Sequence, residues 1–121
     1  MLLYISNSKT VEDLQDHFND CFPYLKIEFY KDTGPSLKNC EKAYIIRPKT
    51  PLGDIRRKSN TGILDVKSWE KTSKLKQDLK DLYDLNVQVF RMHGLDWIPT
   101  SYSDNLTLRQ QSELARQYVP F

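Results

Sequence analysis

Two stretches of the chain repeat one pattern, and that pattern decides the predicted fold. Residues 10–31 read TVEDLQDHFNDCFPYLKIEFYK, and residues 72–91 read TSKLKQDLKDLYDLNVQVFR. Each stretch begins with a threonine, continues with leucines and an aromatic residue at helical spacing, and ends in alternating apolar residues. Each one therefore predicts an amphipathic helix followed by a strand with one buried face.

The apolar positions of these stretches predict the core. Thr10 is expected to cap the first helix, with Asp13 closing a capping box, and Thr72 is expected to open the second. Cys21 continues the first apolar stripe as a small core residue, and Leu82 belongs to the second stripe. The residues that we expect to form the core are Leu14, Phe18, Ile27, Phe29, Leu75, Leu79, Val87 and Val89.

Shorter signals complete each half of the chain. Apolar runs predict strands ahead of both helices, and Thr107 with Gln110 forms a second capping box that opens a last helix. A short helix is expected after Thr50, because Pro51 suits the first helical position. Each half thus reads strand, helix, strand, strand, helix, with the later strands at Ala43–Arg47 and 95–99. We interpret this as an internal duplication, with halves of approximately 1–60 and 61–121 in a single domain, 1–121.

This order of elements predicts the fold class. A strand–helix–strand unit normally forms a right-handed crossover between parallel strands of one sheet, and the strand that follows can pair as a hairpin. The alternating strands indicate that one face of the sheet contacts water. We therefore expect an α/β (α+β) fold, a two-layer sandwich in which helices cover one face of a mixed sheet, built from two duplicated β-α-β-β-α units.

Composition limits the class of protein. The chain has 121 residues, of which 39% are hydrophobic and 28% charged, and this balance is typical of a soluble globular domain. No apolar run approaches the ~20 residues that span a bilayer, so no membrane partner is expected. The first residues resemble a strand more than a signal peptide, which predicts a cytoplasmic protein. Cys21 and Cys40 are then expected to be thiols rather than a disulfide.

Several segments in order carry a resemblance. FPYLKIEFYK (22–31) follows a helix that begins T-x-x-x-L-Q, and VQVFR (87–91), Trp97 and SDNLTLRQQ (103–111) come later. Together they resemble a family of small bacterial cytoplasmic proteins. That family has no known activity, cofactor or catalytic residue, so the resemblance implies a fold but no chemistry.

The residues that usually perform chemistry are sparse. His17 and His93 lie in no zinc-binding pattern, and no phosphate-binding glycine motif is present. His17 and Cys21 are four residues apart on one helix, but a cysteine packed beside a boundary histidine explains that spacing better than a catalytic pair. We therefore predict no enzyme, no cofactor, no metal and no catalytic residues.

The function that remains by elimination is a non-catalytic protein-interaction module. Tyr24 and Tyr30 are predicted on the polar face of their strand, and Trp97 lies near a strand end, as the aromatic anchors of interfaces do. Exposed sheet edges would also allow strand addition or dimerisation. The expected partner is therefore an unidentified protein or a second copy of the chain.

The alternative is nucleic-acid binding through the basic segment Lys42–Lys58. This segment has six basic residues and one acidic residue, Asp54, although the net charge of the whole chain is only +2. Cations at the end of a short helix also complement its dipole, so the cluster has an ordinary structural explanation. Under the alternative, the residues that contact phosphates are Arg47, Lys49, Arg56, Arg57 and Lys58.

Overall fold

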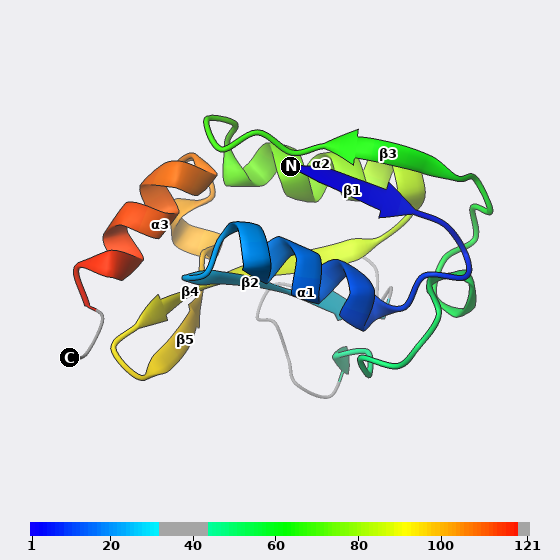
Figure 1. The fold of residues 1–121 in the computed structure, drawn as a ribbon, viewed down its shortest axis with the longest axis horizontal. Coiled ribbons are helices and arrows are strands. Elements are labelled where there is room, and N and C mark those ends of the chain that lie inside the picture. The colour runs from blue at the N-terminus through cyan, green and yellow to red at the C-terminus, as the bar shows by residue number, and fades with distance from the viewer. Residues whose placement is uncertain (32–43, 119–121) are drawn as a thin grey trace.

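The computed structural model describes residues 1–31 and 44–118. Figure 1 shows the arrangement of the helices and strands in this part of the chain. No helix within these two ranges has the length and apolar content that crossing a membrane requires. In chain order the elements are β1 (Leu2–Ile5), α1 (Val11–Cys21), β2 (Leu25–Tyr30), η3 (Leu52–Asp54), β3 (Gly62–Asp65), α2 (Thr72–Tyr83), β4 (Asn86–His93), β5 (Asp96–Pro99), η4 (Ser101–Ser103) and α3 (Leu108–Arg116).

The strands form two separate antiparallel sheets. β1 pairs with β3, and β2, β4 and β5 form a second sheet in the order β2-β4-β5. The predicted mixture of helices and strands is confirmed, but the single mixed sheet is wrong, because the strands on either side of α1 belong to different sheets. Of the strand predicted over 43–47, the described part contains one isolated bridge, between Tyr30 and Ile45.

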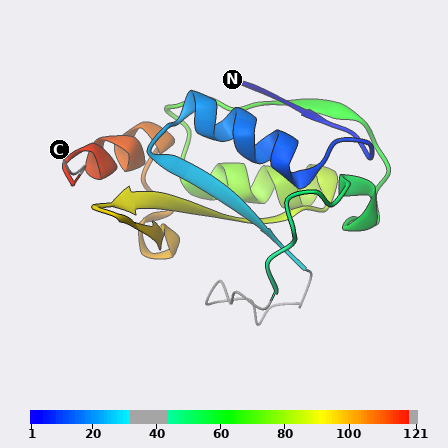
Figure 2. The ribbon, with the colours of Figure 1, turned by 60° about the horizontal axis from the view of Figure 1, so that its bottom comes forward.

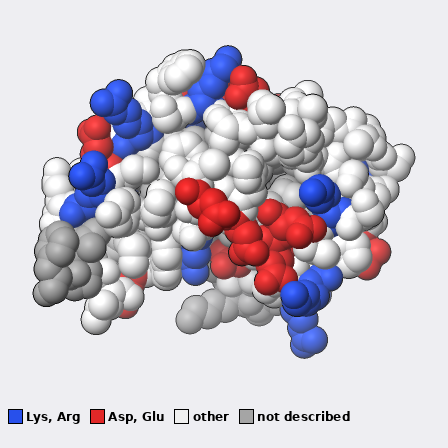
Figure 3. Space-filling view, in the orientation of Figure 1, with Lys and Arg blue, Asp and Glu red and all other residues white. Residues whose placement is uncertain are grey.

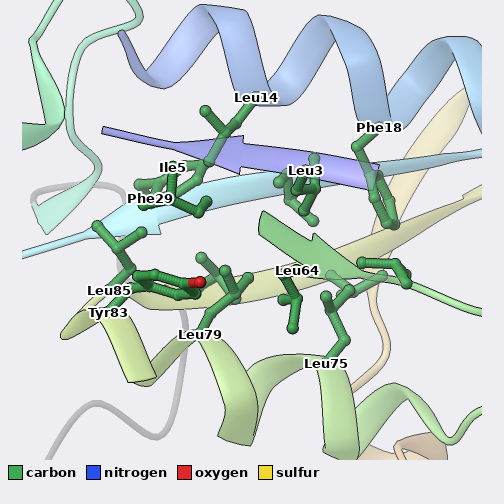
Figure 4. Packing of buried hydrophobic residues seen from close by; sticks show 14 of the residues in the cluster. Leu3, Ile5, Leu14, Phe18, Phe29, Leu64, Leu75, Leu79, Tyr83 and Leu85 are labelled. Atoms are coloured by element: carbon green, nitrogen blue, oxygen red, sulfur yellow. The ribbon is translucent and has the colours of Figure 1, made fainter. Parts of the chain in front are cut away.

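Helices α1 and α2 lie on opposite sides of the core, with the strands between them (Figure 4). β1 and β3 have four residues each, so the sheet that they form is too small to cover two helices. The helices instead close the sides of the core, where Leu14 and Phe18 of α1 point toward Leu75 and Leu79 of α2.

Helix α1 agrees with the prediction from the sequence except at its last residue, Cys21. The Thr10 hydroxyl accepts a hydrogen bond from the Asp13 N–H (3.2 Å), and the Asp13 carboxylate accepts one from the Thr10 N–H (2.9 Å), so the predicted capping box is confirmed. Cys21, however, is exposed, and its prediction as a core residue is wrong. Phe22 takes the inner position instead, because its ring packs 5.2 Å from that of Phe18.

The outward face of α1 is acidic. Figure 3 shows acidic side chains gathered on the face of the molecule that α1 occupies in Figure 1. No basic residue lies in the last turn of the helix. The acidic residues of α1 are Glu12, Asp13, Asp16 and Asp20.

Helix α2 begins at Thr72 as predicted and differs from its predicted form in its last turn. The buried hydroxyl of Thr72 donates to the Leu106 carbonyl (2.9 Å). Leu82 is 49% exposed, because Tyr83 takes the inner position in the last turn. The predicted burial of Leu82 is therefore wrong. Asp84 ends the helix in the left-handed conformation, with φ 55°.

The pairing of β2 with β4 forms the back of the core. Ile27 lies opposite Val89 and Phe29 lies opposite Val87, so four predicted core residues meet on one face of the sheet. All eight residues predicted to form the core are buried, with 9% exposure or less. The helical and strand periods therefore identified the buried faces correctly, although they did not identify which strands pair.

The two halves repeat several backbone hydrogen bonds. At the start of α1 the Val11 N–H donates to the Thr50 carbonyl (3.0 Å), and at the start of α2 the Thr72 N–H donates to the Leu106 carbonyl (2.9 Å). Each helix start is thereby tied to a segment that follows the next strand. The halves differ in their later elements, because the first has η3 and one bridge where the second has α3 and β5. The predicted duplication is not established by these contacts and stays a prediction.

Truncating Phe18 tests the core. Phe18→Ala should lower the free energy of unfolding by about 3–5 kcal/mol, since the ring is completely buried and the cavity cannot fill with water. Denaturant titration measures the loss, and Leu82→Ala on exposed α2 surface provides the control, with a change under about 1 kcal/mol. Equal losses in the two variants would contradict the assignment of the buried faces.

Candidate functional site

A cleft lies where the chain returns to the end of β2. Figure 2 shows the segment after residue 43 running beside that end of β2 and continuing to η3. Two backbone hydrogen bonds hold this segment in place, from the Lys31 N–H to the Tyr44 carbonyl (3.0 Å) and from the Ile46 N–H to the Phe29 carbonyl (2.8 Å). The cleft has a volume of about 740 Å³, and we call it the basic cleft; its lining is Lys31, Ile45, Ile46, Arg47, Thr50, Asp54, Ile55, Arg56 and Arg57.

Lys31, Arg47 and Arg57 are the three exposed basic side chains of the cleft, and none forms an ion pair or a side-chain hydrogen bond within the described part of the chain. The Asp84 carboxylate lies near enough to Arg57 for the arginine charge to help lower the pKa of Asp84. Asp54 is the one acidic residue among the lining residues, while the isoleucines provide an apolar surface. The cleft therefore combines an excess of positive charge with an apolar floor, which suits an anionic ligand that also has apolar groups.

Arg56 lines the cleft but is occupied inside the protein. It is 8% exposed, and its guanidinium donates to the Asn7 side-chain oxygen (2.9 Å) and to both the side-chain and the backbone oxygen of Asn60 (3.0 and 2.5 Å). Burial lowers the pKa of Arg56 from its ordinary value. These bonds join the loop after β1 to the loop before β3, so we assign Arg56 a structural role rather than the predicted contact with phosphates.

Lys49 and Lys58, which were also predicted to contact phosphates, bind other residues of the protein. The Lys49 ammonium lies 2.7 Å from the Glu12 carboxylate, and the hydrogen bond with Glu12 raises the pKa of Lys49. The Lys58 ammonium donates to the Asp81 carbonyl at the end of α2. Of the five residues predicted to contact nucleic acid, Arg47 and Arg57 are thus the two whose side chains line the cleft without an internal partner.

Lys31 is the cleft residue that the sequence did not reveal. It lies outside the basic segment Lys42–Lys58, and only the pairing of residues 44–46 with the end of β2 brings it beside Arg47. The one available signal was its place directly after the alternating residues of β2. Cys40, the other cysteine considered, lies outside the described residues.

The aromatic residues predicted to form an interaction surface are not in the cleft. Tyr30 is 2% exposed, because residues 44–46 run along the edge of β2 beside it, so its prediction as a surface residue is wrong. Tyr24 and Trp97 are half-buried and flank Met92, far along the same sheet. The Lys26 ammonium covers the Trp97 ring at 5.1 Å from its centroid.

The second half of the protein closes the space that corresponds to the basic cleft. When Ile27 is aligned with Val87, Lys31 corresponds to Arg91. The Arg91 guanidinium donates to the Ser103 hydroxyl (2.9 Å) and to the Gln111 side-chain oxygen (2.8 Å).

The first half cannot form these bonds. Repeated backbone contacts match Ser103 with Arg47, and the same alignment matches Gln111 with Ile55. Two cations and an isoleucine cannot reproduce a hydrogen-bonded arginine, serine and glutamine. The first half thus has the cleft, whereas in the second half hydrogen bonds join Arg91 to Ser103 and Gln111.

Other reactive residues are dispersed. His17 and Cys21 are both exposed on α1, with no hydrogen bond between them. Across residues 1–31 and 44–118, no group of three histidine, cysteine, aspartate or glutamate side chains is placed to hold a metal ion. The predicted lack of catalytic, metal and cofactor sites stays a prediction.

Comparison with known proteins gives no significant match to a protein family, to a curated protein or to a solved structure. The resemblance to a bacterial family therefore stays a prediction. Any function has to be argued from the basic cleft itself.

Replacing Arg56 tests its structural role. Arg56→Met should lower the free energy of unfolding by about 2–4 kcal/mol, because it removes the hydrogen bonds that the buried guanidinium donates to the side-chain oxygens of Asn7 and Asn60. Arg57→Met is the matched control on the exposed neighbour and should change stability by less than about 0.5 kcal/mol. Denaturant titration gives both values, and an Arg56→Met protein as stable as the parent would show that the buried bonds contribute nothing.

Asp84 should make stability depend on pH in acid. Its carboxylate accepts hydrogen bonds from the Arg57 N–H (3.0 Å) and from Lys80 (3.1 Å), and these lower its pKa. The folded pKa is thus below the unfolded one, so the stabilisation is complete above about pH 4 and is lost as the pH falls through the folded pKa. Denaturant midpoints against pH should fall less steeply in Asp84→Asn, whereas parallel curves would contradict this role.

Proposed function

We propose that this protein is a non-catalytic interaction module that binds an acidic segment of a partner protein in the basic cleft. The observation that carries the proposal is the set of three exposed cations, Lys31, Arg47 and Arg57, that line the cleft beside isoleucine side chains and form no ion pair among the described residues. Unpaired like charges repel one another, so an anionic ligand would relieve their repulsion as well as bind them.

A protein partner fits the cleft better than nucleic acid. A protein that binds nucleic acid through about 6–10 phosphate contacts needs more cations than the three exposed ones that the described residues place in the cleft. The floor of isoleucines matches apolar side chains of a peptide rather than bases, which stack on aromatic rings.

The proposal includes the origin and location of the protein. Repeated backbone hydrogen bonds at the starts of α1 and α2 support a duplication of halves at approximately 1–60 and 61–121. Under that history, one half kept an open cleft while the other filled the corresponding space with Arg91 and Gln111. The protein is proposed to act in the cytoplasm.

Reversing the charge of the cleft tests the proposal. The probe is a labelled peptide of alternating Glu and Val, and the affinity is measured by fluorescence anisotropy. Arg47→Glu with Arg57→Glu should weaken binding by about tenfold or more, because attraction becomes repulsion. The control, Lys67→Glu with Arg116→Glu, reverses the same number of exposed charges outside the cleft and should stay within about twofold of the parent.

A second probe separates the two functions. A labelled oligothymidine is titrated under the same conditions at about 50 mM salt, where phosphate contacts are strongest. Binding of the oligonucleotide alone, lost in the cleft variant, would replace the proposed function with nucleic-acid binding. Failure of the peptide to bind, or equal weakening in the control, would overturn the role of the cleft.

A further inference from the structure

Ile45, a single residue bridged to β2, has an edge of the backbone in the basic cleft that no described residue pairs with. The bonds that join this segment to β2 use the Tyr44 carbonyl and the Ile46 N–H. Ile45, which bridges to Tyr30, lies between them, so its own N–H and carbonyl point away from β2. Neither group has a hydrogen-bond partner in the described part of the chain.

The corresponding edge in the second half carries a proline. Pro99 lies opposite Phe90 on β4, as Ile45 lies opposite Tyr30 on β2. The residues that follow Pro99 and Ile45 also form equivalent hydrogen bonds. The Thr100 N–H donates to the Val89 carbonyl (3.0 Å), and the Ile46 N–H donates to the Phe29 carbonyl. Proline has no N–H and is a common means of blocking a strand edge. The edge in the basic cleft lacks this protection.

Charge indicates which kind of strand the edge accepts. Ile45, Ile46 and Arg47 all line the cleft, so a segment that pairs with the edge at Ile45 would lie near the Arg47 side chain. Arg57 and Lys31 add positive charge, and neither forms an ion pair with another described residue. A strand with alternating acidic residues would pair with the backbone and place its carboxylates near these cations.

We infer that the partner segment is an extended acidic peptide that adds as a strand to the edge at Ile45. This inference rests on the proposed function and specifies how the cleft performs it. The Ile45 N–H donates to a carbonyl of the added strand, the Ile45 carbonyl accepts from one of its amides, and Arg47 and Arg57 bind its carboxylates. Main-chain bonds provide affinity, and the cations select the acidic sequence.

The first test changes the peptide and leaves the protein intact. The alternating Glu and Val peptide is compared with the same peptide N-methylated at alternate amides, which keeps every charge but removes the backbone donors. The inference predicts that methylation weakens binding by about tenfold or more. It also predicts that exchange of the Ile45 amide hydrogen slows when the unmethylated peptide is bound.

The second test changes the protein. Ile45→Pro removes the donor without changing the charge of the cleft and should weaken peptide binding by about tenfold or more, whereas Ile45→Val should bind as the parent does. Circular dichroism and the denaturant midpoint establish that each variant is folded. If Ile45→Pro does not fold, the comparison of the methylated and unmethylated peptides still tests the inference.

The outcomes separate this inference from the proposed function. Equal binding of the methylated and unmethylated peptides, with weakening by Arg47→Glu and Arg57→Glu, would overturn strand addition while the role of the cleft stands. No binding of either peptide would overturn both. A dimer in sedimentation velocity that Ile45→Pro dissociates would show that a second copy occupies the edge instead, and the peptide inference would be wrong.

Discussion

The structure depends on the antiparallel register between β2 and β4. Glu28 lies opposite Gln88 at the middle of this pairing, and Ile27 and Phe29 meet Val89 and Val87 on the buried face. A shift of one residue would turn every one of these apolar side chains toward water. The same register sets the positions of α1 and α2, because each helix leads directly into one of the two strands. It also fixes the end of β2, where the basic cleft begins.

Local patterns in the sequence were sufficient to predict the helices and their buried faces. The capping boxes at Thr10 and Thr107 and the apolar spacing of Leu14 and Phe18 are local features, and local energetics decide them. The pairing of strands was not predictable in this way, because alternation shows which face is buried and not which strand lies alongside. That is why one mixed sheet was expected where two antiparallel sheets are present.

Errors at single residues have the same physical origin. Cys21 and Leu82 stand at the margins of helical stripes, where a neighbouring aromatic residue competes for the inner position. The alternation along β2 predicts Tyr30 on the solvent face, but Tyr30 is buried where Ile45 bridges to it. In each case a tertiary contact overrides the local period.

The candidate site was accessible to sequence reasoning only in part. A count of charges identified Arg47 and Arg57, since both lie in the basic segment Lys42–Lys58. The count could not show that Arg56 turns inward to Asn7 and Asn60, because those partners come from loops distant in sequence. Nor could it include Lys31. The contrast between an open cleft in the first half and a filled one in the second becomes visible only when the corresponding hydrogen bonds are compared.

The cations around the open edge at Ile45 have a consequence for the protein in concentrated solution. Two copies that approach each other through this edge bring Lys31, Arg47 and Arg57 of one against those of the other, and the repulsion opposes an edge-to-edge dimer. This protection is electrostatic, so it weakens as added ions shorten the range of the repulsion to about 3 Å at 1 M salt. Dilute buffers therefore keep the molecules apart, whereas the strong salt solutions used for crystallisation favour edge-to-edge contacts between copies.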